Sequence, residues 1–316
     1  MVSKTEVELA YRLLLGREPE SRSVVDAVCK SHDSLQDLRR RFMSSPEFFA
    51  QLDRHRLSAM PLSWPPSRVE VELDAGRLQE LITRIEREFV YLAETEPFWS
   101  VISQDRFRVA NIKGSEPAFF RSGKGVVDDF RVTAARYGIE LNTFGICVEL
   151  GCGLGRSTIF LSEEFERVLA LDISAAHLQL ARGFVNEHGK HNVEFLHVNT
   201  LATFENVPEF DAFFSIIVLQ HNPPPLIAYL LKLVLRKLRS NGLAYFQIPT
   251  YKLNYEFVLD TYLAREQPRG IPEVHALPQR DLFRIVQNAK CEVLEIREDD
   301  AAGPQAVSNR ILVRKT

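Results

Sequence analysis

A short apolar run that leads directly into three closely spaced glycines constrains the fold more than any other part of the chain. Residues 146–150 are apolar except for Glu149, and Gly151, Gly153 and Gly155 follow at once. Glycine lets the backbone turn sharply and lets a ligand approach it closely. A strand that ends in such a turn, before a helix whose free amides face the ligand, is typical of nucleotide-binding α/β proteins.

The rest of the C-terminal part supports this interpretation, because apolar runs alternate there with amphipathic stretches. The predicted strands cover residues 146–150, 168–172, 193–198, 210–218, 243–248, 292–296 and 310–314. The predicted helices among them cover residues 156–164, 174–188, 224–239 and 279–289. Strands that alternate with helices form a parallel sheet covered on both faces. The predicted fold class is therefore α/β and Rossmann-like.

The N-terminal part has a different pattern. Ser3 or Thr5 can cap a first helix that Gly16 ends, and further helices are expected to begin at Ser34 and at residues 45–47. Three prolines within residues 60–67 predict an extended linker. We expect a helical domain at 1–60, a linker and helical region at 61–140, and a core at 141–316 with a lid insertion at 250–277.

A long amphipathic helix is predicted from Asp74 onward, with one apolar stripe along residues 74–93. The stripe is expected to pack on its own domain; the alternative is a homo-oligomer contact through this helix.

Composition excludes several classes of protein. The 316 residues are 45% hydrophobic with a net charge of −3, so no strongly basic surface for nucleic acid is expected. The N-terminus does not have the pattern of a signal peptide, and no apolar run is long enough to span a membrane. The four cysteines lack the spacing of metal ligands, so we expect no metal and a cytoplasmic location.

The residues around the glycines indicate which ligand binds. Arg156 stands where the dinucleotide fingerprint has its third glycine, and Glu149 precedes the first. An acid there disfavours a pyrophosphate, and hence a nicotinamide dehydrogenase, and favours a cationic ligand. Asp172 ends the next strand and is placed to accept both hydroxyls of a ribose; its alternative role is a helix cap.

With these features, residues 115–316 resemble the class I S-adenosylmethionine-dependent methyltransferases. The motifs that carry the resemblance are residues 148–155, 171–174, 199–201, 210–215 and 238–242. The resemblance implies a seven-stranded sheet whose last strand, residues 310–314, runs antiparallel beside the fifth. It also implies S-adenosylmethionine as the cofactor.

The resemblance further implies roles for individual residues. The acid at Glu149 and the glycine backbone would hold the methionine end, and Asp172 the ribose. Asn199 would meet the adenine amine, where the family more often has Asp. Phe120 would cover the cofactor and Arg121 would pair with its carboxylate, unless this segment is a surface loop. The other residues expected at the cofactor are Cys152, Ile173, Thr200, Leu201, Ser215 and Gln220.

Methyl transfer to oxygen also needs a base, because a sugar hydroxyl is a poor acid. His221 follows the fourth predicted strand and is the first candidate, although it could instead be a structural histidine. His275 is the second candidate, within the lid insertion, where Tyr251, Tyr255 and other aromatic residues suit a sugar or aromatic acceptor.

The N-terminal residues 3–52 resemble a small helical bacterial module of unknown function that is often fused to polysaccharide enzymes. The resemblance rests on residues 10–19 and 42–48. It favours a sugar of a surface glycan or glycolipid as the methyl acceptor. The alternatives are a small metabolite or quinone as acceptor, or a scaffold that binds the cofactor without catalysis.

Overall fold

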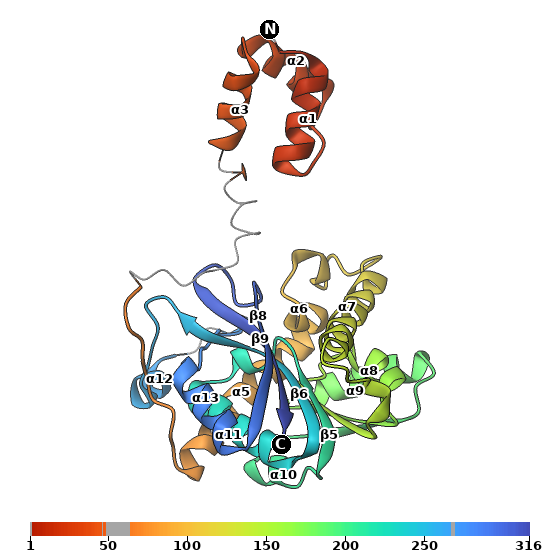
Figure 1. Ribbon diagram of the computed structural model, residues 1–316, viewed down its shortest axis with the longest axis vertical. Coiled ribbons are helices and arrows are strands. Elements are labelled where there is room, and N and C mark those ends of the chain that lie inside the picture. The colour runs from red at the N-terminus through yellow and green to blue at the C-terminus, as the bar shows by residue number, and fades with distance from the viewer. Residues whose placement is uncertain (1, 46, 49–63, 267–268) are drawn as a thin grey trace. The chain divides into compact units, whose positions relative to one another are not determined.

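The computed structural model describes residues 2–45, 47–48, 64–266 and 269–316. The chain divides into two compact units, Met1–Ala59 and Met60–Thr316. The first is built of helices and the second of a sheet with helices on both faces (Figure 1). Among the described residues, no helix is long and apolar enough to cross a membrane.

The helical unit contains α1 (Lys4–Leu15), α2 (Arg22–Ser31) and α3 (Leu35–Met43). Ser3 caps α1 and Gly16, at φ 64°, ends it, as the sequence predicts. Ser34 caps α3, also as predicted. Helix α2 was not predicted from the sequence. The helix predicted to start at residues 45–47 falls largely outside the described residues.

The second unit is organised around a seven-stranded sheet with the order β4-β3-β2-β5-β6-β9-β8. Its strands are β2 (Ile146–Leu150), β3 (Arg167–Asp172), β4 (Val193–His197), β5 (Phe210–Ser215), β6 (Leu238–Lys252), β8 (Cys291–Asp299) and β9 (Ala306–Lys315). The neighbouring strands β4, β3, β2, β5 and β6 are parallel to one another. β9 lies between β6 and β8 and runs antiparallel to both. The predicted fold and its antiparallel last strand are confirmed. Strand order reverses between β2 and β5, so a ligand cleft is expected there.

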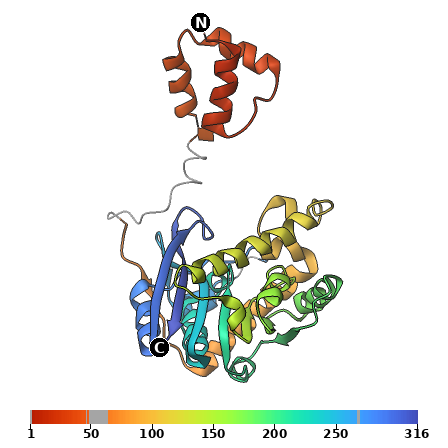
Figure 2. The same ribbon diagram turned by 45° about the vertical axis from the view of Figure 1, so that its right-hand side comes forward.

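Helices cover both faces of this sheet (Figures 1 and 2). One face packs against α5 (Ala75–Thr95), α10 (Leu201–Glu205), α11 (Pro224–Lys237) and α13 (Gln279–Asn288). The other packs against α7 (Glu116–Ala135), α8 (Thr158–Glu164) and α9 (Ala175–Glu187). Adjacent residues of one strand serve opposite faces: Phe213 packs on the α11 side and Phe214 on the α7 side.

The apolar stripe of α5 packs inside its own unit. Leu81 and Ile82 are fully buried, and Ile85 contacts the cluster that holds α11 to the sheet. This arrangement matches the first of the two interpretations of the stripe. An oligomer through residues 74–93 stays a prediction.

The lid insertion is tied to the segment that follows the linker. β6 continues to Lys252, further than predicted, and leads into β7 (Glu256–Phe257) and α12 (Leu259–Ala264). β7 pairs in parallel with β1 (Arg68–Val69), which forms a second, two-stranded sheet. The remaining short elements are α6 (Pro97–Val101), η1 (Asp105–Phe107), η2 (Leu141–Thr143) and η3 (Leu219–His221).

Candidate cofactor site

A cavity of about 90 Å³ lies at the carboxyl ends of β2, β3 and β5, where the strand order reverses. Its walls come from both faces of the sheet and from α6. The predicted site residues that line it are Glu149, Gly151, Cys152, Gly153, Asp172, Ile173 and His221.

The glycine loop turns at Gly151, which has a φ of 75°. A Cβ atom there would lie 2.4 Å from Cγ2 of Val218, so only glycine fits. The amides of Gly151 and Cys152 donate to the carbonyl of Leu171, at 2.7 and 3.0 Å. These bonds fix the loop to the end of β3, beside Asp172.

Asp172 is 6% exposed, and both of its carboxylate oxygens already accept a backbone hydrogen bond. Oδ2 accepts from the amide of Gly153 and Oδ1 from that of Ser174, each at 2.8 Å. A carboxylate offers about four lone pairs, so two remain for a ligand with two hydroxyls. The residue therefore serves as a local cap and can also bind a ribose.

Two buried groups of opposite charge line the same cavity. Burial raises the pKa of Glu149 to about 7, although Thr158 donates a hydrogen bond to its Oε2 at 2.5 Å. Burial lowers the pKa of Arg156 to about 10, and none of the described carboxylates forms an ion pair with it. A buried charge without a partner is unfavourable, so this pair suits a zwitterion, with an ammonium for Glu149 and a carboxylate for Arg156.

Helix α6 covers the glycine loop. Oγ of Ser100 lies 2.9 Å from Nε2 of His177, and it donates to the carbonyl of Pro97 at 2.8 Å. Cγ2 of Val101 lies 2.7 Å from the position that a Cβ atom on Gly153 would take. These side chains line the cavity, whose volume of about 90 Å³ is below the range of about 300–1,000 Å³ that small-molecule sites have.

His221 projects into the cavity from η3. Its Nδ1 donates to the carbonyl of Glu273 at 2.9 Å, which leaves Nε2 with the lone pair. The side-chain amide of Gln220 donates to that lone pair at 3.3 Å. Burial lowers the pKa of His221 to about 4, so the ring is neutral at pH 7.

The loop that carries His221 begins at a strained residue. Ile217 has a φ of 62°, which a β-branched residue seldom adopts. Its amide donates to Oε1 of Gln247 at 3.1 Å, and Nε2 of Gln247 donates to Oε1 of Gln220 at 3.0 Å. A buried amide network therefore holds the turn between β5 and η3 in place.

Several predicted residues lie outside the cavity because α5 covers them. Nδ2 of Asn199 donates to Glu86 at 2.8 Å, and its carbonyl accepts from Gln79 at 3.1 Å. Gln79 also accepts from the amide of Leu201 at 3.0 Å. The other predicted residues that do not line the cavity are Gly155, Thr200, Ser215 and Gln220.

Phe120 and Arg121 are also outside the cavity, because α7 begins at Glu116 and places both residues inside a helix. In a helix, neighbouring residues point in different directions. Phe120 packs into an aromatic cluster with Phe98 and Phe184, whereas Arg121 is exposed to solvent. Of the two arginines, Arg156 lines the cavity and Arg121 does not.

His275 lines a second cavity, in the lid insertion. It is 4% exposed, and its Nδ1 lies 2.7 Å from the hydroxyl of Tyr255. Its backbone amide donates to the carbonyl of Gln220 at 2.7 Å. The two candidate histidines therefore belong to neighbouring segments but to different cavities.

Sequence reasoning missed Arg156, His177, Ser100 and Val101 as cavity residues. Arg156 was noted only as a departure from the dinucleotide fingerprint, although its position in the turn indicated proximity to the ligand. Ser100 and Val101 precede the core and carry no motif, so only tertiary packing reveals them.

Comparison with known proteins decides the class of this site. Residues 147–242 match the family model described as a methyltransferase domain. The chain contains a methyltransferase domain. The matched residues include the glycine loop, Asp172 and His221, and the match confirms the predicted enzyme class and its cofactor, S-adenosylmethionine.

Solved structures share the fold of the methyltransferase domain. Magnesium protoporphyrin IX methyltransferase from Synechocystis PCC 6803 with bound SAH matches at a TM-score of 0.52 and 13% identity. That match covers 75% of this chain and all of the other. The same protein with bound SAM matches at 0.51 and 14% identity, over 78% of this chain and 100% of the other. At these identities the likeness shows the fold alone. A search of curated proteins found no match.

Proposed function

We propose that the protein transfers the methyl group of S-adenosylmethionine to a hydroxyl group of a sugar in a bacterial surface glycan or glycolipid. The observation that supports S-adenosylmethionine as the methyl donor is the cavity between β2 and β5, where the strand order reverses. Glu149, Arg156 and Asp172 converge there, within a methyltransferase domain. These groups complement the ammonium, the carboxylate and the ribose of the donor.

The site residues have distinct roles in this proposal. Glu149 and Arg156 hold the methionine end, and Asp172 accepts the two ribose hydroxyls. The acceptor oxygen attacks the methyl carbon, and the S–CH₃ bond breaks with its electron pair going to sulfur. The hydroxyl proton passes to Nε2 of His221, after the hydrogen bond that Gln220 donates to this nitrogen has been released. Alignment in a water-excluded site supplies most of the acceleration. The cavity of about 90 Å³ is too small for the whole donor, so we expect α6, which contributes Ser100 and Val101 to the lining, to move outward when the cofactor binds.

The sugar half of the proposal is supported by the lid insertion and the N-terminal unit. Tyr255 and Tyr262 line the lid cavity beside His275 and Glu273, a combination of aromatic and polar groups that suits a hydroxylated ring. The resemblance of residues 3–52 to a module of polysaccharide enzymes points the same way.

Transfer of tritiated methyl from S-adenosylmethionine to a panel of surface glycans, free sugars and quinones tests the proposal. We expect label in a glycan or sugar fraction. Label found only in quinones would show that the acceptor is a quinone and not a sugar. Binding of the donor without transfer to any acceptor would favour a scaffold protein.

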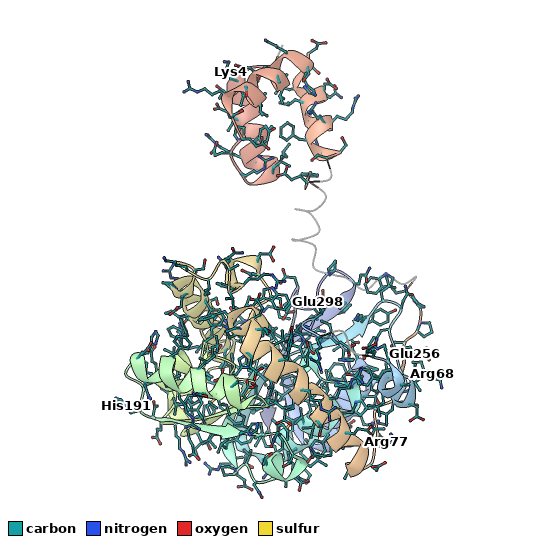
Figure 3. The ribbon with its side chains drawn as sticks, turned by 180° about the vertical axis from the view of Figure 1, so that it is seen from behind. Lys4, Arg68, Arg77, His191, Glu256 and Glu298 are labelled. Atoms are coloured by element: carbon teal, nitrogen blue, oxygen red, sulfur yellow. The ribbon has the colours of Figure 1, made fainter. Side chains whose placement is uncertain are left out.

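Replacing His221 by Ala is expected to slow methyl transfer by about a hundred- to ten-thousandfold, the usual contribution of a positioned base. Binding of S-adenosylhomocysteine, measured by calorimetry, should change by less than about threefold, since the histidine contacts the acceptor. His191→Ala, at an exposed histidine labelled at the periphery in Figure 3, is the matched control. Unchanged turnover in His221→Ala would remove its role as base.

Binding of S-adenosylhomocysteine is expected to strengthen as pH rises toward 7, because its ammonium group needs ionised Glu149. The pKa of Glu149 in the free protein is about 7, so a proton must leave when the ligand binds at lower pH. The affinity should change by up to about tenfold per pH unit below that pKa and level off above it. Calorimetry at pH 6 in buffers of different ionisation enthalpy should show release of about one proton.

Glu149→Gln is the control for this pH dependence, since an amide cannot ionise. The variant should bind more weakly at pH 8 and show a flatter profile. The same slope in both proteins would assign the proton to another group. The folding stability of the free protein depends on pH in the opposite direction to its ligand affinity. The raised pKa of Glu149 adds stability that is fully present below about pH 4.5, and this stability is lost as pH rises through 7.

A further inference from the structure

A second cavity, here named the lid cleft, lies between β1 and the lid insertion and has a volume of about 720 Å³. This volume is within the range of about 300–1,000 Å³ that small-molecule sites have. Its lining residues are Arg68, Lys252, Asn254, Tyr255, Glu256, Phe257, Val258, Thr261, Tyr262, Arg265, Pro272, Glu273, Val274 and His275. None lies within the matched residues 147–242, so the methyltransferase domain match does not account for the cleft.

The charges of the lid cleft are unbalanced. Arg68 pairs with Glu256 at 3.4 Å, and Arg265 pairs with Glu273. Arg68 and Glu256 lie together at the outer edge of the lid in Figure 3. In each of these two ion pairs, the positive and the negative charge cancel. Lys252 also lines the cleft, and none of the carboxylates in the described ranges forms an ion pair with it. One positive charge is therefore left without a partner.

Lys252 is half-buried, which makes the missing partner costly. Its Nζ donates to the carbonyl of Val274 at 2.9 Å and lies 5.6 Å from the ring centre of Tyr255. An ammonium has three donors, so two remain for a ligand. Burial lowers the pKa of Lys252, because the charged form is poorly solvated there. A bound anion would restore the lost solvation.

The lid cleft is connected to the cofactor cavity by backbone hydrogen bonds. The carbonyl of Glu273 accepts from Nδ1 of His221 at 2.9 Å, and the amide of His275 donates to the carbonyl of Gln220 at 2.7 Å. The segment 273–275 thus lines the cleft on one side and orients the proposed base on the other. A ligand group anchored in the cleft is held beside the loop that carries the chemistry.

We propose that the lid cleft binds a phosphate ester carried by the acceptor, with Lys252 as its ligand. Lysine is a frequent phosphate ligand because its compact charge carries three rotatable donors. The acceptor is then a phosphorylated sugar. This inference rests on the proposed function, since it names the acceptor of that same reaction.

Calorimetry of phosphate binding tests the cleft directly. The full-length protein is first saturated with S-adenosylhomocysteine and then titrated with glucose 1-phosphate. Lys252→Met, which keeps an unbranched side chain of similar length, is expected to weaken glucose 1-phosphate binding by at least about tenfold, and Lys252→Arg to retain most of it. Lys113→Met, at an exposed lysine outside the cleft, should bind as the unaltered protein does.

Three further titrations identify the ligand. Inorganic phosphate and methyl glucoside should each bind at least about tenfold more weakly than glucose 1-phosphate, because each offers half of the ligand. Equal binding of inorganic phosphate would overturn the assignment to the acceptor. Glucuronate carries a carboxylate instead of a phosphate. If it binds as tightly as glucose 1-phosphate, the inference that the lid cleft selects a phosphate ester is wrong. No binding of glucose 1-phosphate, or equal binding by Lys252→Met, would overturn the site.

The first step of the experiment separates this inference from the proposed function. If S-adenosylhomocysteine does not bind, the proposed function fails. If it binds in all variants and glucose 1-phosphate does not, only the inference about the lid cleft fails.

Discussion

Replacing Asp172 by Asn is expected to weaken the binding of S-adenosylhomocysteine by at least about a hundredfold. Hydrogen bonds to a charged group contribute about 1.5–3 kcal/mol each, and a tenfold change in affinity corresponds to about 1.4 kcal/mol. Two lost ribose bonds therefore account for a factor of about a hundred or more. An amide cannot substitute, because Gly153 and Ser174 each present an N–H donor to one oxygen of the carboxylate.

Asp260→Asn is the matched control, at an aspartate whose side chain is 85% exposed and pairs with Arg77. It should leave the affinity unchanged, and thermal unfolding of both variants separates a binding defect from a folding defect. A 2′,3′-dideoxy analogue of the ligand sharpens the test. It lacks the hydroxyls, so the unaltered protein and Asp172→Asn should bind it about equally. If Asp172→Asn weakens binding of the analogue as much as binding of S-adenosylhomocysteine, Asp172 does not act through the ribose hydroxyls.

The parts of the site that could be predicted from the sequence are those fixed by local chain geometry. Glu149, the glycines and Asp172 sit within or directly after strands whose apolar pattern is unmistakable, and the ends of neighbouring parallel strands must meet. The fold follows from the same alternation of strands and helices. The predicted boundaries of β2, 146–150, match the structure.

The parts that could not be predicted depend on contacts between distant segments. Asn199 follows β4 as expected, but Glu86 and Gln79 of α5, more than a hundred residues earlier, cover it. Arg156 is adjacent to the motif, yet its burial without a carboxylate partner arises from packing around it. Periodicity in the sequence carries no information about such long-range contacts.

The start of α7 shows two local signals in conflict. Pro117 falls in the first helical turn, which is typical of a helix start. Gly123 and Gly125 soon follow, and glycine disfavours the interior of a helix. The structure resolves the conflict, because Gly123 is needed for packing against the glycine loop.

Replacing that Gly123 by Ala is expected to destabilise the protein by about 3 kcal/mol, at the upper end for overpacking a close contact. An added Cβ would lie 1.9 Å from the carbonyl oxygen of Arg156 and 2.6 Å from its carbonyl carbon. Both atoms are backbone, so relief requires α7 or the cofactor loop to move. The melting temperature should fall by about 6–12 °C, and binding of S-adenosylhomocysteine should weaken in the protein that remains folded.

Gly125→Ala provides a control on the same helix with the same chemical change. Apart from the helix's own backbone, no atom of the described residues lies within 4 Å of its added Cβ, so alanine should stabilise the helix by about 0.5–1 kcal/mol. The two substitutions therefore have opposite expected signs, which a general intolerance of α7 to alanine cannot produce. Equal melting temperatures for the two variants would show that α7 does not approach the loop this closely. A loss of stability in Gly123→Ala with unchanged ligand affinity would show that α7, and not the cofactor loop, yields to the new methyl group.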